Sequence, residues 1–552
     1  MLRASALLLL TLLACGRAAV VQAPLDAGGA PDAGAPLDAG APDSGAPDAG
    51  APDAGEPGDA GAPDAGPDAG PPDAGPPLTT ARVIFHLHSA ISHDACDGHG
   101  SAGGALATLD QDCLDQLEAA LCSQRIDVAF LTDHPAYMDS KSIEDDSLLR
   151  GRGETALRDA AGHVVGSQLS CPGGRTVLLA PGWESTHTLP LGLTTLDLDP
   201  GTFGTATTGT TSLADDQAAL AAVHAAGGLY FTAHSEEDDL PLSRLRELQT
   251  DGMEWYNVHG NILALMGDVV GGNVDLAHVK DLASALGGLE PFLEGGNASA
   301  DLVYLQLLDA KFPEAGLQKW FDVLATRPIV GGLGSDVHRN VSVKPLCKGA
   351  VALAACQAAA SAVPNLLTAL AAGGQLMLSD GERIDSYARV LRWLNNRVLV
   401  HGPGLDEARA ALGHGRSYGV FAVLGEPGVF SFQTATSAGL LELGDTGPAA
   451  GAVLRVRLPD RPAPDLGPQW TPADAARSEL HALLWRTTAS GQQLAAEWHG
   501  FGSSVELPAP GPGRYSLEVR LVPRHLEQLL GKASALAGHE FRWILTNAIE
   551  LQ

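Results

Sequence analysis

Histidine and carboxylate residues recur in short clusters between residues 86 and 338. The first cluster is His86-Leu87-His88 and the last is Asp336-Val337-His338. Residues two apart in a β-strand point to the same side, so both side chains of each pair can contact one ion. Imidazole and carboxylate ligands without thiolates are typical of sites for Zn²⁺, Mn²⁺ or Fe²⁺, and a carboxylate can bridge two ions. These residues therefore predict a centre of two or three divalent metal ions.

Four further clusters lie between these two pairs. They are Thr132-Asp133-His134, Gly182-Trp183-Glu184, Ala233-His234 and Met253-Glu254-Trp255. A single histidine beside an apolar segment is usually a structural residue. Six clusters that follow six successive apolar segments indicate a functional site instead.

The apolar segments that precede or contain these clusters have the length and composition of β-strands. The expected strands are 82–88, 126–132, 176–183, 229–233, 252–256 and 328–334. Helix-compatible segments such as 112–124, 215–226 and 301–325 lie between them, and separations of about 20 to 70 residues suit parallel crossovers. The pattern predicts an α/β fold, a barrel whose active face lies at the carboxyl ends of its strands.

The order and spacing of the clusters resemble the PHP (polymerase and histidinol phosphatase) superfamily. The resemblance covers residues 81 to about 340. Its motifs are His86-Leu87-His88-Ser89, Ser92-His93-Asp94, Leu131-Thr132-Asp133-His134, Gly182-Trp183-Glu184, Ala233-His234, Met253-Glu254-Trp255-Tyr256-Asn257 and Gly334-Ser335-Asp336-Val337-His338. This resemblance implies a distorted (β/α)₇ barrel with up to three metal ions.

The resemblance also assigns metal ligands motif by motif. The first ion would be held by His86, His88, Glu184 and Asp336, the second by Asp94, His134 and His338, and the third by Glu184, His234 and Glu254. Asp94 is preferred to its neighbour His93 because of its spacing from His88. His259 is a further candidate near the third ion.

The activity that the resemblance implies is hydrolysis of a phosphomonoester or phosphodiester by water that the metal ions ionise. Glu184, Asp336 and His338 would be catalytic in the sense that they place these ions. No phosphate-binding loop of the G-x-x-x-x-G-K-[ST] type and no H-E-x-x-H motif occurs in the sequence. Two alternatives stay open: a metallohydrolase of a non-phosphate bond, and a non-catalytic surface binding protein stabilised by metal.

The amino-terminal segment resembles a bacterial lipoprotein signal peptide. Arg3 precedes an apolar segment too short to span a bilayer, and Leu12-Leu13-Ala14-Cys15 looks like a lipobox. We expect residues 1–14 to be the signal peptide and Cys15 to be lipidated. The protein is then exported and anchored to a bacterial membrane, on the periplasmic or the cell-surface side.

Residues 15–80 are predicted to be a disordered tether. Positions 23–77 repeat Ala-Pro-Asp-Ala-Gly with small variations and contain 13 of the 36 prolines and 11 acidic residues. Pro removes backbone donors and the acidic residues repel one another, so this segment cannot form a core.

The charge of the chain argues against binding to duplex nucleic acid. Lys and Arg total 34 against 65 Asp and Glu, which gives a formal net charge of −31. Duplexes and anionic membranes are bound through dense basic patches, and the sequence has none. A small-molecule phosphoester is the expected substrate, and the membrane contact is expected only through the lipid.

Six cysteines remain after Cys15, and an even number in an exported protein favours disulfides. Six cysteines allow 15 pairings. Cys347 with Cys356 is the first pair to test.

The pattern changes after the predicted barrel domain, residues 81–417. Short alternating segments separated by Gly and Pro turns predict a smaller β-sandwich over 418–552. Its expected strands include 453–458, 481–485, 504–507, 515–521 and 541–546.

Overall fold

The computed structural model describes residues 78–98, 109–134, 154–195, 213–262, 287–310, 314–343, 364–372, 374–463 and 476–552. Leu78–Gln552 belong to one compact unit. Cys15, the predicted signal peptide and residues 15–77 of the predicted tether lie outside the described residues. Among the helices that are described, none is long and apolar enough to cross a bilayer.

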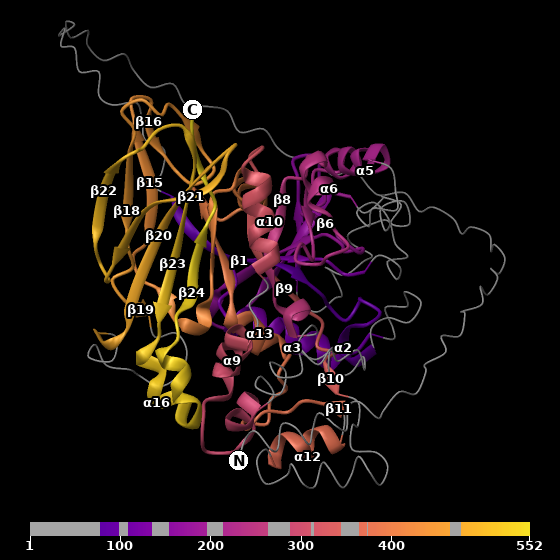
Figure 1. Ribbon diagram of the computed structural model, residues 1–552. Coiled ribbons are helices and arrows are strands. Elements are labelled where there is room, and N and C mark those ends of the chain that lie inside the picture. The colour runs from indigo at the N-terminus through magenta and orange to yellow at the C-terminus, as the bar shows by residue number, and fades with distance from the viewer. Residues whose placement is uncertain are drawn as a thin grey trace, which may run out of the picture. The chain divides into compact units, whose positions relative to one another are not determined.

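Six parallel strands form the centre of a large sheet (Figure 1). Their order in space is β5-β2-β1-β9-β8-β7. They are β1 (Thr79–Leu87), β2 (Val128–Leu131), β5 (Thr176–Pro181), β7 (Leu229–Thr232), β8 (Gly252–Asn257) and β9 (Val330–Val337). Each of the six predicted strands is found, which confirms the prediction of an α/β fold. Since these strands are parallel, their carboxyl ends lie at the same edge of the sheet.

Antiparallel strands extend this sheet at positions where no strand was predicted. They are β3 (Thr155–Arg158) and β4 (Val164–Ser170), which follow β5, and β6 (Thr188–Leu191), which pairs with β7. A single bridge between Gly182 and Leu191 joins the end of β5 to β6. The segment that follows Glu184 therefore turns back along the sheet.

The helices pack on the sheet through apolar faces. Helix α3 (Gln111–Ser123) begins at Asp110, whose carboxylate accepts a hydrogen bond from the Cys113 amide, and buries Leu114, Leu117 and Leu121. The helix predicted over 301–325 is divided into a 3₁₀ turn (Ala300–Leu302), α9 (Val303–Ala310) and α10 (Glu314–Leu324). The other α-helices in the described part of the chain are α2 (Ala95–Gly98), α5 (Leu213–Ala225), α6 (Leu242–Glu247), α12 (Pro364–Ala372), α13 (Tyr387–Trp393), α14 (Leu405–His414) and α16 (Glu527–Leu530).

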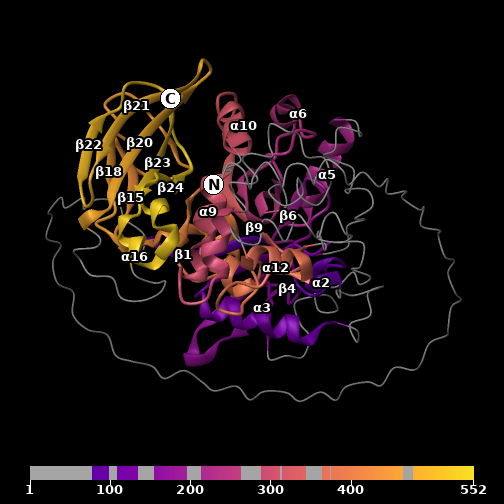
Figure 2. The same cartoon turned by 60° about the horizontal axis from the view of Figure 1, so that its bottom comes forward.

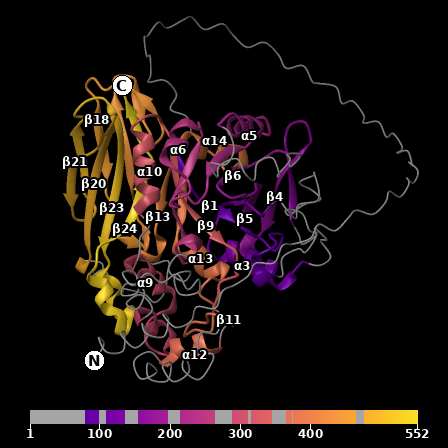
Figure 3. The same ribbon diagram turned by 45° about the vertical axis from the view of Figure 1, so that its right-hand side comes forward.

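The sheet continues across residue 417, where the sequence predicted a domain boundary. Strand β12 (Asn395–Val400) pairs with the first half of β1 and with β13 (Ser417–Val420), and β13 pairs with β24 (Phe541–Thr546). Beyond β24 follow β23 (Gly513–Val522), β20 (Glu479–Thr488) and β21 (Gly491–His499), as Figure 3 shows. Strand β25 (Ile549–Leu551) pairs with β23 and with the short β17 (Thr446–Gly447).

A second, four-stranded antiparallel sheet contains the remaining long strands of this region. Its order is β16 (Gly439–Leu441), β15 (Ser431–Thr436), β18 (Val453–Arg457) and β22 (Ser504–Pro508), of which the last three are labelled in Figure 2. Phe432, Leu454 and Val456 of this sheet are buried in the same core as Leu484 and Leu517 of the large sheet. Two-stranded pairings join β10 (Ser342–Val343) to β11 (Gly374–Gln375) and β14 (Glu426–Pro427) to β19 (Pro462–Ala463).

Two disulfides link described cysteines. Cys96 bonds to Cys113 and Cys122 bonds to Cys171. The expectation that cysteines are paired is confirmed for these four residues. Cys347 and Cys356 lie outside the described residues.

Candidate metal centre

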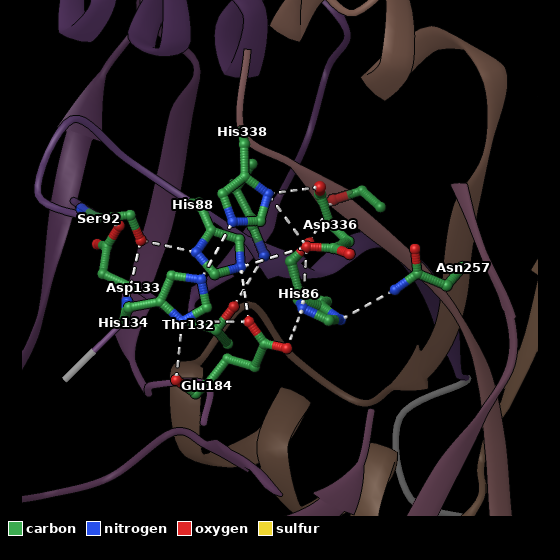
Figure 4. Close-up of polar contacts among 12 residues, drawn as sticks. His86, His88, Ser92, Thr132, Asp133, His134, Glu184, Asn257, Asp336 and His338 are labelled. Atoms are coloured by element: carbon green, nitrogen blue, oxygen red, sulfur yellow. Dashed lines mark hydrogen bonds and ion pairs between the residues drawn. The ribbon is translucent and has the colours of Figure 1, made fainter. Parts of the chain in front are cut away.

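The carboxyl ends of the parallel strands bring histidines and acids together in one cluster. His86 and Asp336 lie within β1 and β9, while His134, Glu184 and His234 follow β2, β5 and β7. His86, His88, Glu184, Asp336 and His338 are buried. The imidazoles of His86, His88, His134 and His338 lie around the carboxylates of Glu184 and Asp336 (Figure 4).

The backbone at this edge departs from regular strand geometry. His86, His234 and Asp336 have φ angles of 57°, 48° and 49°, a region that residues other than glycine rarely adopt. The register of β1 against β2 and β9 shifts around His86. His86 and His88 do share a cluster, but the reason is a bulge rather than simple strand alternation. Such strain costs on the order of 1–3 kcal/mol per residue and is concentrated at functional sites.

Glu184 lies at the middle of the cluster and contacts four histidines. Its Oε1 lies 3.0 Å from His234 Nε2 and 3.5 Å from His86 Nε2. Its Oε2 lies 3.4 Å from His88 Nε2 and 3.4 Å from His134 Nδ1. A carboxylate with two oxygens in two sets of imidazoles has the arrangement of a bridging ligand.

The four residues predicted for the first ion form one group. Ligand atoms of His86, His88, Glu184 and Asp336 all lie within 4.8 Å of one another. Asp336 Oδ1 is 3.2 Å from His86 Nε2 and 3.4 Å from His88 Nε2. These three buried atoms form no hydrogen bond with any described residue. Buried polar atoms that face one another in this way fit a cation between them.

The residues predicted for the second ion form a triangle of ligand atoms. His134 Nε2 and His338 Nε2 are 3.3 Å apart, and each is 3.5 Å from Asp94 Oδ2. Ligands of one tetrahedral ion with bonds of 2.0–2.1 Å would be ~3.3–3.4 Å apart. His88, His134, Glu184 and His338 form a further group whose ligand atoms lie within 4.8 Å. The ligand atoms therefore fit two neighbouring ions that share Glu184.

The contacts of the Nδ1 atoms of His134 and His338 indicate the tautomer of each ring. His134 Nδ1 lies 3.1 Å from the Glu184 carbonyl oxygen, and His338 Nδ1 lies 3.0 Å from the Asp336 carbonyl oxygen. A carbonyl only accepts, so in the neutral ring each Nδ1 carries the proton and each Nε2 presents a lone pair. The two Nε2 atoms at 3.3 Å therefore need a cation between them, which in the metal-free protein is the proton that His134 holds and which a metal ion would replace.

The structure does not bring all residues predicted for the third ion together. His234 Nε2 contacts Glu184 Oε1 and lies 3.6 Å from Asp336 Oδ2. Glu254 instead lies behind His86: its Oε1 is 2.7 Å from His86 Nδ1, and its Oε2 accepts from the His234 amide and from Asn257. Both oxygens of Glu254 thus contact residues of the cluster and orient them.

The imidazoles and carboxylates of the cluster stabilise each other's charged forms. Burial alone lowers the pKa of His86, but the carboxylates of Asp336, Glu254 and Glu184 raise it well above its usual value. Burial lowers the pKa of His134 too, yet Asp94 and Glu184 outweigh this effect and raise it to about 9. Burial raises the pKa of Glu184 and of Asp336, and the neighbouring imidazoles then hold both well below their usual values. A site that stabilises positive charge on imidazoles also stabilises a dication.

Two residues that the sequence did not single out position these ligands. Ser92 Oγ lies 2.7 Å from His88 Nδ1 and accepts from the His134 amide. Asp133 accepts hydrogen bonds from the Ser89 amide, the Ser89 hydroxyl and the Ser92 amide. Both residues belong to the sequence motifs that also contain ligands, and this position is the sequence feature from which their role could have been predicted.

The remaining histidines near the cluster are placed as follows. His93, which the sequence ranked below Asp94, is half exposed and reaches only 4.0 Å from Asp94. The ring of His259 is 4.9 Å from the ring of His338, so it lies beside the second group. Burial lowers the pKa of His259 to about 3. It is therefore neutral and able to act as a ligand.

Comparisons with known proteins add little to this geometry. No family model and no curated protein sequence matches the chain. A two-domain protein from Bacteroides vulgatus, described as containing a predicted PHP-like metal-dependent phosphoesterase, is 11% identical. The likeness covers 85% of this chain and 96% of that one, with a TM-score of 0.26. PsfC from Pseudomonas syringae is 14% identical over 47% of this chain and 77% of its own, with a TM-score of 0.24. TM-scores below 0.5 establish no common fold, so the function is argued from the cluster itself.

Proposed function

We propose that the protein is a metal-dependent phosphoesterase of the PHP type. The large parallel sheet would belong to the distorted (β/α)₇ barrel of residues 81–417, followed by a β-sandwich of residues 418–552. The active centre would contain two or three divalent ions, Zn²⁺, Mn²⁺ or Fe²⁺. The substrate would be a small phosphomonoester or phosphodiester.

One observation carries this proposal. The Nε2 atoms of His134 and His338 face each other at 3.3 Å, and their Nδ1 atoms are directed at backbone carbonyls. Asp94 Oδ2 completes the triangle. This arrangement is that of three ligands of one ion, and Glu184 links it to the group of His86, His88 and Asp336.

Divalent ions at these positions would lower the pKa of water, polarise a phosphoryl group and neutralise the leaving oxygen. The residues of the chain supply the placement that this chemistry needs. Glu184 links the two groups through its two oxygens, and Asp336 contacts the imidazoles of His86, His88 and His338. Asp94, with a side chain 37% exposed, marks the side from which a substrate could enter.

We further propose that the protein is exported and tethered to a membrane through Cys15. The lipobox and the Pro-rich repeat support this location. Cys15→Ser should move the protein from the membrane fraction to the soluble fraction of the cells that express it. Unchanged fractionation would rule out the anchor and leave the enzymatic proposal intact.

The sharpest test of the activity is Glu184→Gln, which keeps the volume of the side chain and removes its charge. Metal content per chain should fall by at least one ion, and hydrolysis of phosphoesters should fall about 100-fold or more. The matched control is Glu518→Gln. Glu518 is also buried, but it pairs with Arg520 and Arg542 in another part of the chain. The control should retain both metal and activity.

A panel of substrates separates this proposal from its alternatives. Phosphomonoesters, phosphodiesters, carboxylic esters and amides are assayed with native protein before and after chelation. Phosphoester turnover that chelation abolishes and Mn²⁺ or Zn²⁺ restores supports the proposal. Metal-dependent turnover of esters or amides alone would indicate a different hydrolase. Turnover that resists chelation, or full activity of Glu184→Gln, would refute the assigned centre.

A further inference from the structure

A second group of potential metal ligands lies beside the cluster and is formed by His187, Glu237 and Asp239. His187 Nε2 is 3.0 Å from Asp239 Oδ1 and 3.8 Å from Glu237 Oε2. All three ligand atoms lie within 4.8 Å of one another. The ring of His187 is 6.5 Å from the ring of His234. The sequence analysis assigned no functional role to His187.

His187 is held rigidly by the strands that also carry the cluster. It lies in the tight turn between Ser185 and Thr188, whose backbones exchange two hydrogen bonds. Its carbonyl accepts from the Ala233 amide, and its Nδ1 lies 3.2 Å from the Ala233 carbonyl oxygen. Only 1% of the His187 side chain is exposed. The ring orientation is therefore fixed before any ligand binds.

The hydrogen bond of His187 Nδ1 determines the tautomer of the ring and therefore whether Nε2 can bind a cation. The Ala233 carbonyl can only accept, so Nδ1 of the neutral ring carries the proton and Nε2 presents a lone pair. That lone pair faces a carboxylate oxygen of Asp239 at 3.0 Å. A cation between these two atoms holds them at this distance, either a proton on Nε2 or a metal ion that takes its place. A backbone carbonyl on Nδ1 with Nε2 directed outward is also the usual arrangement of a metal-binding histidine.

The surrounding charge favours a cation. Glu237 and Asp239 belong to the acidic segment Glu236-Glu237-Asp238-Asp239. Lys319 offsets part of this negative charge, and its ammonium group donates to the backbone carbonyls of Glu237 and Leu240. The side chains of Glu237 and Asp239 are 51% and 62% exposed, so they can close on an ion from solvent.

We infer that His187, Glu237 and Asp239 form a separate binding site for a divalent transition-metal ion. One imidazole and two carboxylates suit Mn²⁺ or Zn²⁺, with the remaining coordination positions left to water. The site is distinct from the cluster around Glu184 because none of its three ligands contacts Glu184 or Asp336 among the described interactions. This inference does not depend on phosphoesterase activity.

The test measures binding of Mn²⁺ alone to the full chain by equilibrium dialysis. His187→Ala and Asp239→Asn should each bind one ion fewer than the native protein at saturation. Asp239→Asn is an exposed and nearly isosteric change, so it keeps the test valid even if His187→Ala unfolds. The matched control is His224→Ala, which breaks another histidine and aspartate pair, with Asp251. This control should bind as many ions as the native protein.

A second measurement locates the ion. Crystals soaked in MnCl₂ should show an anomalous peak next to His187 Nε2, and the peak should be absent in Asp239→Asn. In Glu184→Gln the peak beside His187 should persist while the cluster loses metal, which separates the two sites. Equal Mn²⁺ stoichiometry in all variants, or crystals with no peak at His187, would show that His187 and Asp239 are only an ion pair and would overturn the inference.

Discussion

The Nδ1 atom of His86 lies 2.7 Å from Oε1 of Glu254, behind the imidazole and away from the other ligands. This contact directs His86 Nε2 toward Glu184 and Asp336. The other oxygen of Glu254 accepts from the His234 amide and from Asn257 Nδ2. Glu254 therefore holds two strand ends of the cluster in place.

Glu254→Gln should weaken metal binding although no ligand atom is removed. The carboxamide has one acceptor oxygen, so its amino group must face either His86 Nδ1 or the donors of His234 and Asn257. We expect the metal affinity to fall about 10–100-fold, which titration of the metal-free protein with Zn²⁺ in competition with a chelator would measure. Glu518→Gln is again the control, and equal affinity in both variants would show that Glu254 has no positioning role.

A glycine on the neighbouring strand gives an independent test of the same contact. A Cβ atom at Gly334 would lie 1.7 Å from Glu254 Oε1. Gly334→Ala should therefore displace Glu254 and reduce metal affinity as Glu254→Gln does. Gly404→Ala is a control, since the nearest atom to its Cβ is the Cβ of Glu407 at 3.8 Å.

The sequence predicted which strands carry the cluster but not how each side chain is directed. The position of Glu184 after β5 and of His338 after β9 could be predicted, since residue type and strand order suffice. The role of Glu254 could not, because the register of β8 against β9 shifts between Glu254 and Tyr256. The positive φ angle of His86 could not be predicted either. Both depend on contacts between segments distant in sequence, which a pattern of residue types does not contain.

Ser92→Ala should loosen both groups of ligands together. Ser92 Oγ lies between His88 Nδ1 and the His134 amide, so its loss leaves two donors without a partner. We expect metal affinity to decrease about 10-fold and the protein to lose ~1–3 kcal/mol of stability. Calorimetry and metal titration would measure both, with Ser123→Ala at the exposed end of helix α3 as the control. A change in stability without a change in metal affinity would contradict the positioning role.

The two disulfides should differ in their effect on metal binding. Cys96–Cys113 and Cys122–Cys171 close loops with sequence separations of 17 and 49, so their removal should cost ~3 and ~4 kcal/mol of stability. The Cys96 amide donates to the carbonyl of His338, and Cys96 stands two residues after Asp94. Only Cys96→Ser/Cys113→Ser should therefore lower metal affinity, measured by titration at a temperature where both double variants stay folded. Equal affinities would show that the segment around Asp94 is held without its disulfide.

Metal affinity should rise with pH. In the metal-free protein the pKa of His134 is raised to about 9, so this imidazole holds a proton at pH 7, and the neighbouring carboxylates raise the pKa of His86 as well, so both imidazoles favour their protonated forms. A metal ion must displace these protons, and each displaced proton contributes about tenfold in affinity per pH unit. Titrations with Mn²⁺ between pH 6 and 8.5 should show this slope and release of protons into weak buffer. A pH-independent affinity over this range would contradict the shifted pKa values.

The stability of the metal-free protein should fall as the pH rises, in contrast to its metal affinity. A histidine with a pKa of about 9 in the folded state and 6.5 in the unfolded state stabilises the fold fully below pH 6.5. This contribution is lost as the pH rises through 9. Thermal unfolding of the chelated protein should therefore show a falling Tm between pH 7 and 9, while His134→Gln should show a smaller fall.

Glu118 in helix α3 should destabilise the protein at neutral and alkaline pH. Burial and the charge of Glu154 raise the pKa of Glu118 from 4.5 to about 7. The folded state therefore binds a proton between pH 4.5 and 7 that the unfolded state lacks, so the free energy of unfolding decreases as the pH rises through this window. Glu118→Gln should remove this decrease and stabilise the protein at pH 8 by about 0.5 kcal/mol, a small value because both carboxylates are partly exposed.

Urea unfolding at pH 5 and pH 8 would measure the difference. Glu154→Gln should give a similar gain, and the double variant should gain little more, because either change removes the same repulsion. Fully additive gains in the double variant would show that the two carboxylates act independently.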